Sequence, residues 1–267
     1  GVRGAALATV LSQGVSGVLC FAFIRKKFPI LHLSRKDFAL DGRLALKHLG
    51  IGLPMAFQFS ITAIGVIVLQ GALNLFGEEK IAAYTAASKV EQLVSQPAGT
   101  FGVTMANYAG QNLGAARIDR IKKGVRQATF LTLCFAVFGM LVMTLFGSPL
   151  TRLFIKAEDA AQAGEIIAAS RQYLKISAAF FPFLFVIFIY RNALQGIGHS
   201  FMPLMGGVTE LVVRCAAALV LPGLLGFTGV CLAGPLAWVS AAVLLCISWF
   251  VIIRRVELQY AARPHGL

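Results

Sequence analysis

Four charged residues lie inside long apolar stretches, and they are the residues best placed to do chemistry: Lys89, Glu91, Glu210 and Arg214. In hydrocarbon a charged side chain costs at least about 2.5–3.5 kcal/mol at mid-helix, so such residues usually face a protein interior or a wet cavity. Glu210 and Arg214 are four apart and share a helical face, which predicts a structural ion pair. Lys89 and Glu91 are two apart and point in different directions, so each needs its own partner. Glu91 is our candidate for binding a proton, a sodium ion or a substrate, and pairing with a charge on another helix is the alternative.

Uncharged polar side chains extend this candidate site. Gln58 follows Pro54, and Gln92 and Gln96 precede Pro97. Proline inside a membrane helix frees a carbonyl group and kinks the helix. Such breaks can place polar groups near the middle of a bilayer, although proline is also common in membrane helices that only pack together. The candidate ion-coupling or substrate pathway therefore comprises Glu91, Lys89, Gln92, Gln58 and Gln96.

The cysteines and histidines indicate no metal site. All five cysteines lie in apolar runs and form no CxxC pair, and the four histidines lie in or beside polar segments without metal-ligand spacing. The apolar runs contain no paired aspartates and no central histidine, which catalysis inside a membrane would need. We therefore predict no catalytic residue, no metal and no bound cofactor, and conclude that the chain is not an enzyme.

The composition indicates a membrane protein. Of the 267 residues, 58% are hydrophobic and only 13% are charged, whereas soluble domains are about 45–50% apolar and about 25% charged. The net charge of +13 would suggest a nucleic-acid partner in a soluble protein. Here the basic residues lie between apolar runs, as the positive-inside bias of membrane proteins requires. We therefore expect an all-α, polytopic helix bundle in a lipid bilayer, without nucleic acid.

Seven apolar runs are long enough to span a bilayer as helices, since a span needs about 20 residues. They are Ala5–Ile24, Gly50–Phe76, Ile81–Asn107, Ala128–Leu150, Gln172–Leu194, Met202–Leu225 and Thr228–Ile253. We divide the chain accordingly into a first transmembrane helix, a basic cytoplasmic linker, a six-helix transmembrane lobe and a cytoplasmic tail. Their ranges are 1–24, 25–49, 50–255 and 256–267.

Basic residues are distributed unequally between the connections. The segments after the first, third and seventh spans are rich in lysine and arginine, whereas those after the second and sixth hold one and none. In the fourth connection Arg152, Lys156 and Arg171 are offset by acidic residues, and Arg191 is expected at the end of the fifth span. Because basic segments are retained in the cytoplasm, we predict a multi-pass protein of the cytoplasmic membrane with its N-terminus outside and its C-terminus in the cytoplasm.

Four segments together resemble the multidrug and toxic compound extrusion (MATE) family. They are the opening GVRGAALATVLSQ, the runs Ala82–Gln111 and Arg191–Ser200, and Glu210–Arg214 after Pro203. Members of that family are cation-coupled antiporters with twelve spans in two six-helix lobes around a cleft. The resemblance implies that this chain is the sixth span, the linker and the second lobe, and that the first five spans are absent. It also implies a missing N-terminal lobe as partner, and export of small amphipathic or cationic compounds such as drugs.

The sequence departs from the family in its acidic residues. Some members carry a coupling glutamate in the first span of the second lobe and an aspartate in the fourth, but Gly50–Phe76 and Gln172–Leu194 contain no acidic residue. The coupling site therefore cannot be carried over, and Glu91 is our substitute on physical grounds. The coupling ion, H+ or Na+, stays open. Gly110 and Gly114 are expected to turn the chain out of a helix that ends near Asn107.

Two other functions remain as alternatives. A related flippase for lipid-linked precursors would share the architecture, but a strongly basic cavity would favour it, and only Lys89 and Arg214 are basic in mid-span. A seven-helix receptor would match the number of spans and the outside start. The retinal-binding version of such a receptor is excluded, because Thr228–Ile253 contains no lysine.

Overall fold

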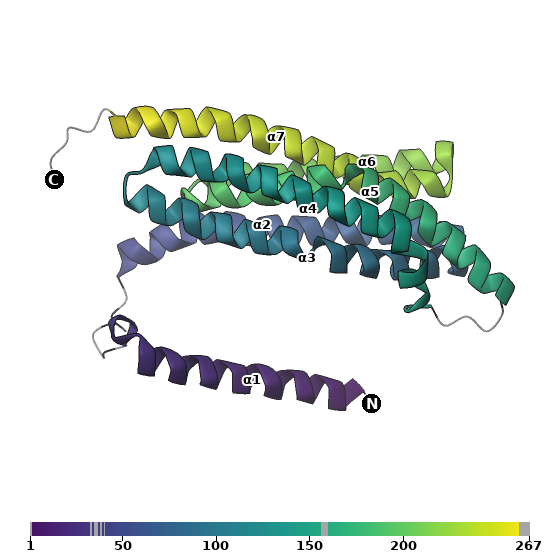
Figure 1. Cartoon of the computed structure of the whole chain (residues 1–267), viewed down its shortest axis with the longest axis horizontal. Helices are drawn as coiled ribbons and strands as arrows, with labels where there is room; N and C mark the ends of the chain where they lie inside the picture. The colour runs from purple at the N-terminus through teal and green to yellow at the C-terminus, as the bar shows by residue number, and fades with distance from the viewer. Residues whose placement is uncertain are drawn as a thin grey trace. The chain divides into compact units, whose positions relative to one another are not determined.

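The computed structural model describes residues 2–32, 34, 37, 39, 41–155 and 160–261, and every regular element among them is a helix (Figure 1). The chain forms two compact units, Gly1–His48 and Leu49–Leu267, which we describe separately. Six charged residues in the polar segments between or after the predicted spans lie outside the described residues. They are Arg35, Lys36, Lys156, Glu158, Asp159 and Arg263.

The first unit is dominated by one apolar helix, α1 (Val2–Lys27). It extends beyond the predicted span, and its last turn carries Arg25, Lys26 and Lys27, where positive charge is favoured by the helix dipole. A short 3-10 helix, η1 (Pro29–Leu31), follows. A ring nitrogen of His32 lies 2.6 Å from the Arg25 carbonyl oxygen, which ties the chain after the helix back to its last turn.

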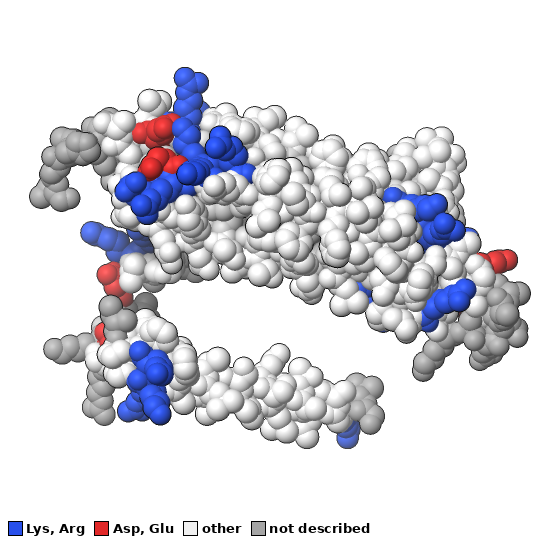
Figure 2. Space-filling model, in the orientation of Figure 1, with Lys and Arg blue, Asp and Glu red and all other residues white. Residues whose placement is uncertain are grey.

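The second unit is a bundle of long helices, with one short 3-10 helix, η3 (Asn74–Phe76), after the first of them. The bundle helices are α2 (Gly42–Leu73), α3 (Glu78–Gly114), α4 (Ile118–Arg152), α5 (Ala160–Gly196), α6 (Phe201–Leu225) and α7 (Phe227–Ala261). Lys, Arg, Asp and Glu gather at the two ends of this bundle, with an almost uncharged surface between them (Figure 2). The predicted all-α class is confirmed, and each predicted span falls on its own helix.

By length and composition, six helices among the described residues could cross a membrane: α1, α2, α4, α5, α6 and α7. The helix that does not qualify is α3, which has 37 residues but contains Lys89 and Glu91 among many small and hydroxylated residues. A helix that polar can cross a bilayer only with its polar face covered by protein or water. The helix that fails the length and composition criteria for a membrane span is therefore the one that carries Glu91.

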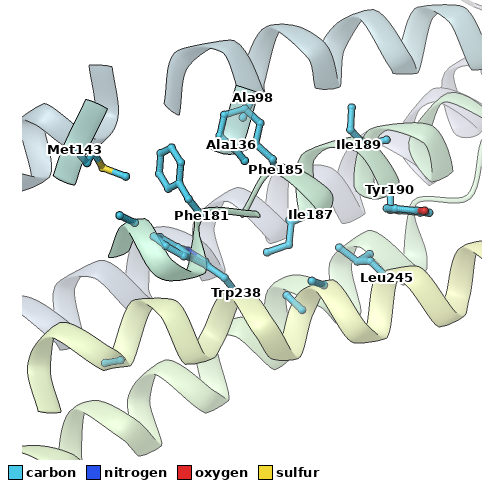
Figure 3. Packing of buried hydrophobic residues seen from close by; sticks show 14 of the residues in the cluster. Ala98, Ala136, Met143, Phe181, Phe185, Ile187, Ile189, Tyr190, Trp238 and Leu245 are labelled. Carbon is cyan, nitrogen blue, oxygen red and sulfur yellow. The ribbon is translucent and has the colours of Figure 1, made fainter. Parts of the chain in front are cut away.

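The core of the bundle is organised around α5, which contacts α3, α4, α6 and α7. A helix that is apolar on all sides is buried on all sides, and α5 has the largest buried share of the candidate spans. Phe181 and Phe185 of α5 are fully buried and pack in the same cluster as Trp238 and Leu245 of α7 and Met143 of α4 (Figure 3).

A close helix crossing joins α3 to α5. A Cβ atom on Gly196 would collide with the Ala106 carbonyl group, and one on Gly102 would lie 2.6 Å from Nδ2 of Asn192. Small residues at such positions let two backbones approach closely, which is how membrane helices gain packing energy without a hydrophobic driving force. The crossing therefore fixes α3, and with it Glu91, against α5.

The structure corrects two local predictions. α3 does not end near Asn107 but continues to Gly114, and the left-handed residue in the turn is Ala116, with φ 56°. Gly110 is a packing position, because a Cβ there would lie 3.2 Å from the Gly196 carbonyl oxygen. The prolines Pro54 and Pro97 lie inside continuous helices, so they do not divide α2 and α3 into separate segments.

Candidate functional site

Glu91 is held inside the bundle by a hydroxyl group. The Tyr173 hydroxyl of α5 donates a hydrogen bond of 2.7 Å to Oε2 of Glu91. Tyr173 is 6% exposed, and its ring meets Tyr84 of α3 edge to face with centroids 4.9 Å apart. One turn further along α5, the Ser177 Oγ is buried and has no hydrogen-bond partner among the described residues. The carboxylate thus lies among hydroxyl groups, with no lysine or arginine in direct contact.

Glu210 lies in a very different environment. Oε1 accepts a hydrogen bond of 2.6 Å from Nη2 of Arg214, and Oε2 accepts one of 3.2 Å from Nη2 of Arg191 on α5. The three side chains are only 7–12% exposed. One carboxylate therefore joins two guanidinium groups, and this triad ties α5 to α6 inside the apolar bundle. Such desolvated, charge-assisted bonds depend on every member being present.

Arg191 was predicted at the end of the fifth span, and that prediction is wrong. α5 continues to Gly196, so Arg191 lies within the helix, where it pairs with Glu210. Sequence spacing could not reveal this, since the partners lie on different helices. The extra arginine gives the triad one net positive charge. Arg214 also acts electrostatically on Glu91, so the two acidic residues share one field.

Gln58 lies at the contact between α2 and the rest of the bundle. It is 1% exposed, and its Oε1 accepts a hydrogen bond of 3.0 Å from Nε2 of Gln195 on α5. Gly207 of α6 makes room for it, because a Cβ there would lie 3.0 Å from Cγ of Gln58. Further along α2, a Cβ on Gly65 would lie 3.3 Å from Nη1 of Arg214. α2 therefore rests on the bundle through polar side chains.

The other predicted pathway residues do not join Glu91. Lys89 is exposed, and its Nζ lies 5.8 Å from the centroid of the Phe154 ring, in a hollow of about 350 Å³ that Glu78 also lines. Long side chains on a helix point toward its N-terminus, which brings the ammonium group nearer the end of the bundle. Gln92 and Gln96 are exposed on α3. The structure thus separates Glu91 and Gln58, which face protein, from Lys89, Gln92 and Gln96, which do not.

Sequence reasoning also missed Tyr173 and Gln195, the hydrogen-bond partners of Glu91 and Gln58. The signal available for Tyr173 was its spacing of four from Ser177, which puts two hydroxyl groups on one face of an otherwise apolar helix. Within the described part of the chain, no three His, Cys, Asp or Glu residues come together as metal ligands. The prediction that no metal binds stays a prediction.

Comparison with known proteins agrees with this architecture. Two solved structures have the same fold: a transporter of the MOP superfamily from Pyrococcus furiosus, with a TM-score of 0.86 at 20% identity, and the MATE transporter VcmN of Vibrio cholerae, with 0.85 at 19%. They match 95% and 97% of this chain, and the match covers 57% and 58% of theirs. The chain therefore shares the fold of these two membrane transporters.

The sequence gives the particular family. A family model described as MatE matches residues 52–220, and the chain belongs to that family. The probable multidrug resistance protein NorM of Thermotoga maritima is 30% identical over 208 residues, and YpnP of Bacillus subtilis is 27% identical over 199. The chain spans 43% of the length of each. The resemblance seen in the sequence is confirmed, as is the prediction that the chain is not an enzyme.

Proposed function

We propose that this chain forms the second lobe of a cation-coupled antiporter that exports amphipathic, cationic compounds in exchange for protons or sodium ions. The observation that supports the proposal most directly is Glu91, a carboxylate inside the bundle whose direct partner is the Tyr173 hydroxyl. A carboxylate without a bonded cation can take up a proton or a sodium ion, whereas one clamped by arginines cannot. The names of the relatives as multidrug resistance proteins supply the substrate class.

The buried charges suggest how coupling would work. Arg191 and Arg214 carry two positive charges, and Glu210 and an ionised Glu91 carry two negative charges, so the set is neutral. When Glu91 takes up a proton or a sodium ion, the set gains one positive charge. A cationic substrate nearby is then repelled, while an ionised Glu91 attracts it. Alternating occupancy by the ion and the substrate is the basis of exchange.

A flippase for lipid-linked anionic precursors is the competing function. For the Pyrococcus furiosus relative, the reverse polarity of its binding pocket suggests a different function. In this chain the second buried arginine, Arg191, adds positive charge, but it is bonded to Glu210. Because the interior charges balance while Glu91 is ionised, the interior carries no excess positive charge that would attract an anionic precursor, which supports the first proposal over a flippase.

The test is dye efflux from vesicles that contain a complete transporter carrying this lobe. Glu91→Gln should abolish gradient-driven export of a cationic dye while the protein is still made and inserted. Glu257→Gln is the matched control, because it removes a carboxylate at the bundle surface, where Glu257 pairs with Lys122. Unchanged efflux in Glu91→Gln would reject the coupling role, and efflux driven by ATP without an ion gradient would reject an antiporter.

The membrane orientation belongs to the same proposal. We place the N-terminus outside and the C-terminus in the cytoplasm, because α4 begins and α7 ends in basic clusters and basic segments stay in the cytoplasm. Single cysteines introduced at Arg120 and at Leu75, on opposite ends of the bundle, would report the two sides. In right-side-out vesicles, an impermeant maleimide should label position 75 and spare position 120. Labelling of position 120 and protection of position 75 would reject the proposed orientation.

A further inference from the structure

A groove on the second unit is unexplained by transport. It has a volume of about 610 Å³ and lies between α4 and α7, with Tyr190 of α5 at its floor. Its walls are apolar and aromatic: Val125, Phe130, Leu133, Trp249, Phe250 and Ile253. Tyr190 packs against Trp249 with ring centroids 6.1 Å apart. Trp249 and Tyr190 are buried, whereas Phe130 and Phe250 are 72% and 64% exposed, so the groove opens on the surface of the bundle.

One end of this groove is basic. Lys122, Lys123 and Arg126 line it there, near the start of α4. Lys122 is paired with Glu257 at 3.0 Å. Lys123 and Arg126 have no carboxylate partner among the residues that the structure describes. The rim therefore presents two uncompensated positive charges directly above an apolar, aromatic channel.

The dimensions match one leaflet of a bilayer. Lys123 and Leu133 are ten residues apart on α4, which is about 15 Å along a helix. The hydrocarbon core of a bilayer is about 30 Å thick, so the channel reaches from the headgroup level to the midplane. Basic pockets between membrane helices are suited to anionic lipid headgroups, and aromatic rings are favoured at the interface below them.

We propose that this groove is a binding site for one anionic phospholipid. Its phosphate contacts Lys123 and Arg126, and an acyl chain lies along Phe130, Leu133 and Phe250. The apolar wall selects a lipid over a free phosphate ion, because a small anion would leave the channel unfilled. The uncompensated rim charges select an anionic lipid over a zwitterionic one, whose ammonium group these charges would repel.

Trp249 in the groove wall allows a direct test. The chain has two tryptophans, Trp238 and Trp249, so Trp238→Phe leaves Trp249 as the only fluorescent reporter. Residues 1–267 with this change are purified in detergent and titrated with phosphatidylglycerol brominated on its acyl chains. Quenching should saturate at a concentration at least tenfold lower than with brominated phosphatidylcholine. Equal quenching by the two lipids would overturn the proposal.

Two variants separate the rim from the wall. The double variant Lys123→Gln with Arg126→Gln should remove the tenfold preference for phosphatidylglycerol. The control, Arg120→Gln with Arg254→Gln, removes the same charge at the same end of the bundle but outside the groove. This control should keep the preference. Leu133→Trp, read by native mass spectrometry, should lower phosphatidylglycerol occupancy without any change of charge. Loss of preference in both double variants, or displacement of the lipid by an equal concentration of inorganic phosphate, would overturn the proposal. Helical circular dichroism checks that each variant is folded.

Discussion

Glu91 and Glu210 are both acidic residues inside the same bundle, but their surroundings differ in kind. Glu210 is bonded to two guanidinium groups on two helices. Glu91 accepts a hydrogen bond from a tyrosine hydroxyl, and no lysine or arginine among the described residues forms an ion pair with it. Glu210 is buried and Glu91 is half-buried, so burial is not the main difference between them. What separates the two residues is whether the charge is permanently neutralised by a bonded cation.

The different partners of Glu210 and Glu91 indicate different roles for the two carboxylates. Glu210 bridges Arg191 and Arg214, so removal of its charge would leave two buried arginines unpaired. Glu91 can change its state at small structural cost, since a neutral carboxyl group can still accept the Tyr173 hydrogen bond. The triad thus joins α5 to α6, and Glu91 is the group that we propose to bind and release a cation. Three substitutions test this division, and a fourth tests a surface pair for comparison.

The largest effect is expected for Glu210→Gln. The change leaves Arg191 and Arg214 buried without a counter-charge, which typically costs about 3–5 kcal/mol. The free energy of unfolding of the chain in detergent should fall by that amount. The surface control Glu257→Gln should change it by less than about 1 kcal/mol, as exposed ion pairs contribute little. If Glu210→Gln is as stable as the parent, the triad is not a structural joint.

A smaller loss is expected for Tyr173→Phe. This change keeps the ring packed on Tyr84 but removes the donor to Glu91, and a hydrogen bond to a charged group is worth about 1.5–3 kcal/mol. The free energy of unfolding should fall within that range. The double variant Tyr173→Phe with Glu91→Gln should lose less than Tyr173→Phe alone, because no unpaired charge remains. Equal losses in the single and double variants would mean that Glu91 is already neutral.

Glu91→Gln itself should change the free energy of unfolding by less than about 1 kcal/mol, because the amide oxygen still accepts the Tyr173 hydrogen bond. This near-neutral result, beside the loss of export proposed above, is the signature of a functional acid. Glu91→Leu is the informative companion, since it removes the acceptor and leaves the tyrosine hydroxyl unpaired. A loss with Glu91→Gln as large as that of Glu210→Gln would remove the distinction between the two acids.

The smallest effect is expected at the surface, where the carboxyl groups of Glu79 and Glu165 meet. A hydrogen bond that protonated Glu79 donates to Glu165, together with repulsion by the Glu165 charge, raises the pKa of Glu79 above its ordinary value of 4.5. A raised pKa in the folded state stabilises the fold at low pH, and this contribution is lost as the pH rises through the folded value. Glu165→Gln should therefore raise the melting temperature slightly at pH 7 and not at pH 4. If Glu165→Gln changes the melting temperature by the same amount at pH 7 and at pH 4, the two carboxyl groups do not interact.

Much of the fold was predictable because apolar length is a strong signal in membrane proteins. The predicted spans all fall on helices, and the spacing of Glu210 and Arg214 indicated a pair that the structure contains. Helix ends were less predictable, as Gly110 shows, since a glycine that allows a close approach resembles one that allows a turn. Partners on other helices were the hardest to infer. Nothing in the local sequence connects Arg191 with Glu210 or Tyr173 with Glu91.

The contact between Gly196 and Ala106 has a consequence for how the lobe can move. The two backbones already touch, and even one added methyl group would have no room. α3 and α5 therefore cannot slide past or tilt against each other without losing their packing, and we expect them to move as one rigid unit. α2 is different, because it meets the bundle through side chains: the amide of Gln58, the buried Leu69 and Leu73, and Arg214 beside Gly65. Conformational change within the lobe should thus be concentrated where α2 contacts the bundle. Glu91 should move together with α3 and α5 and keep its contacts with them.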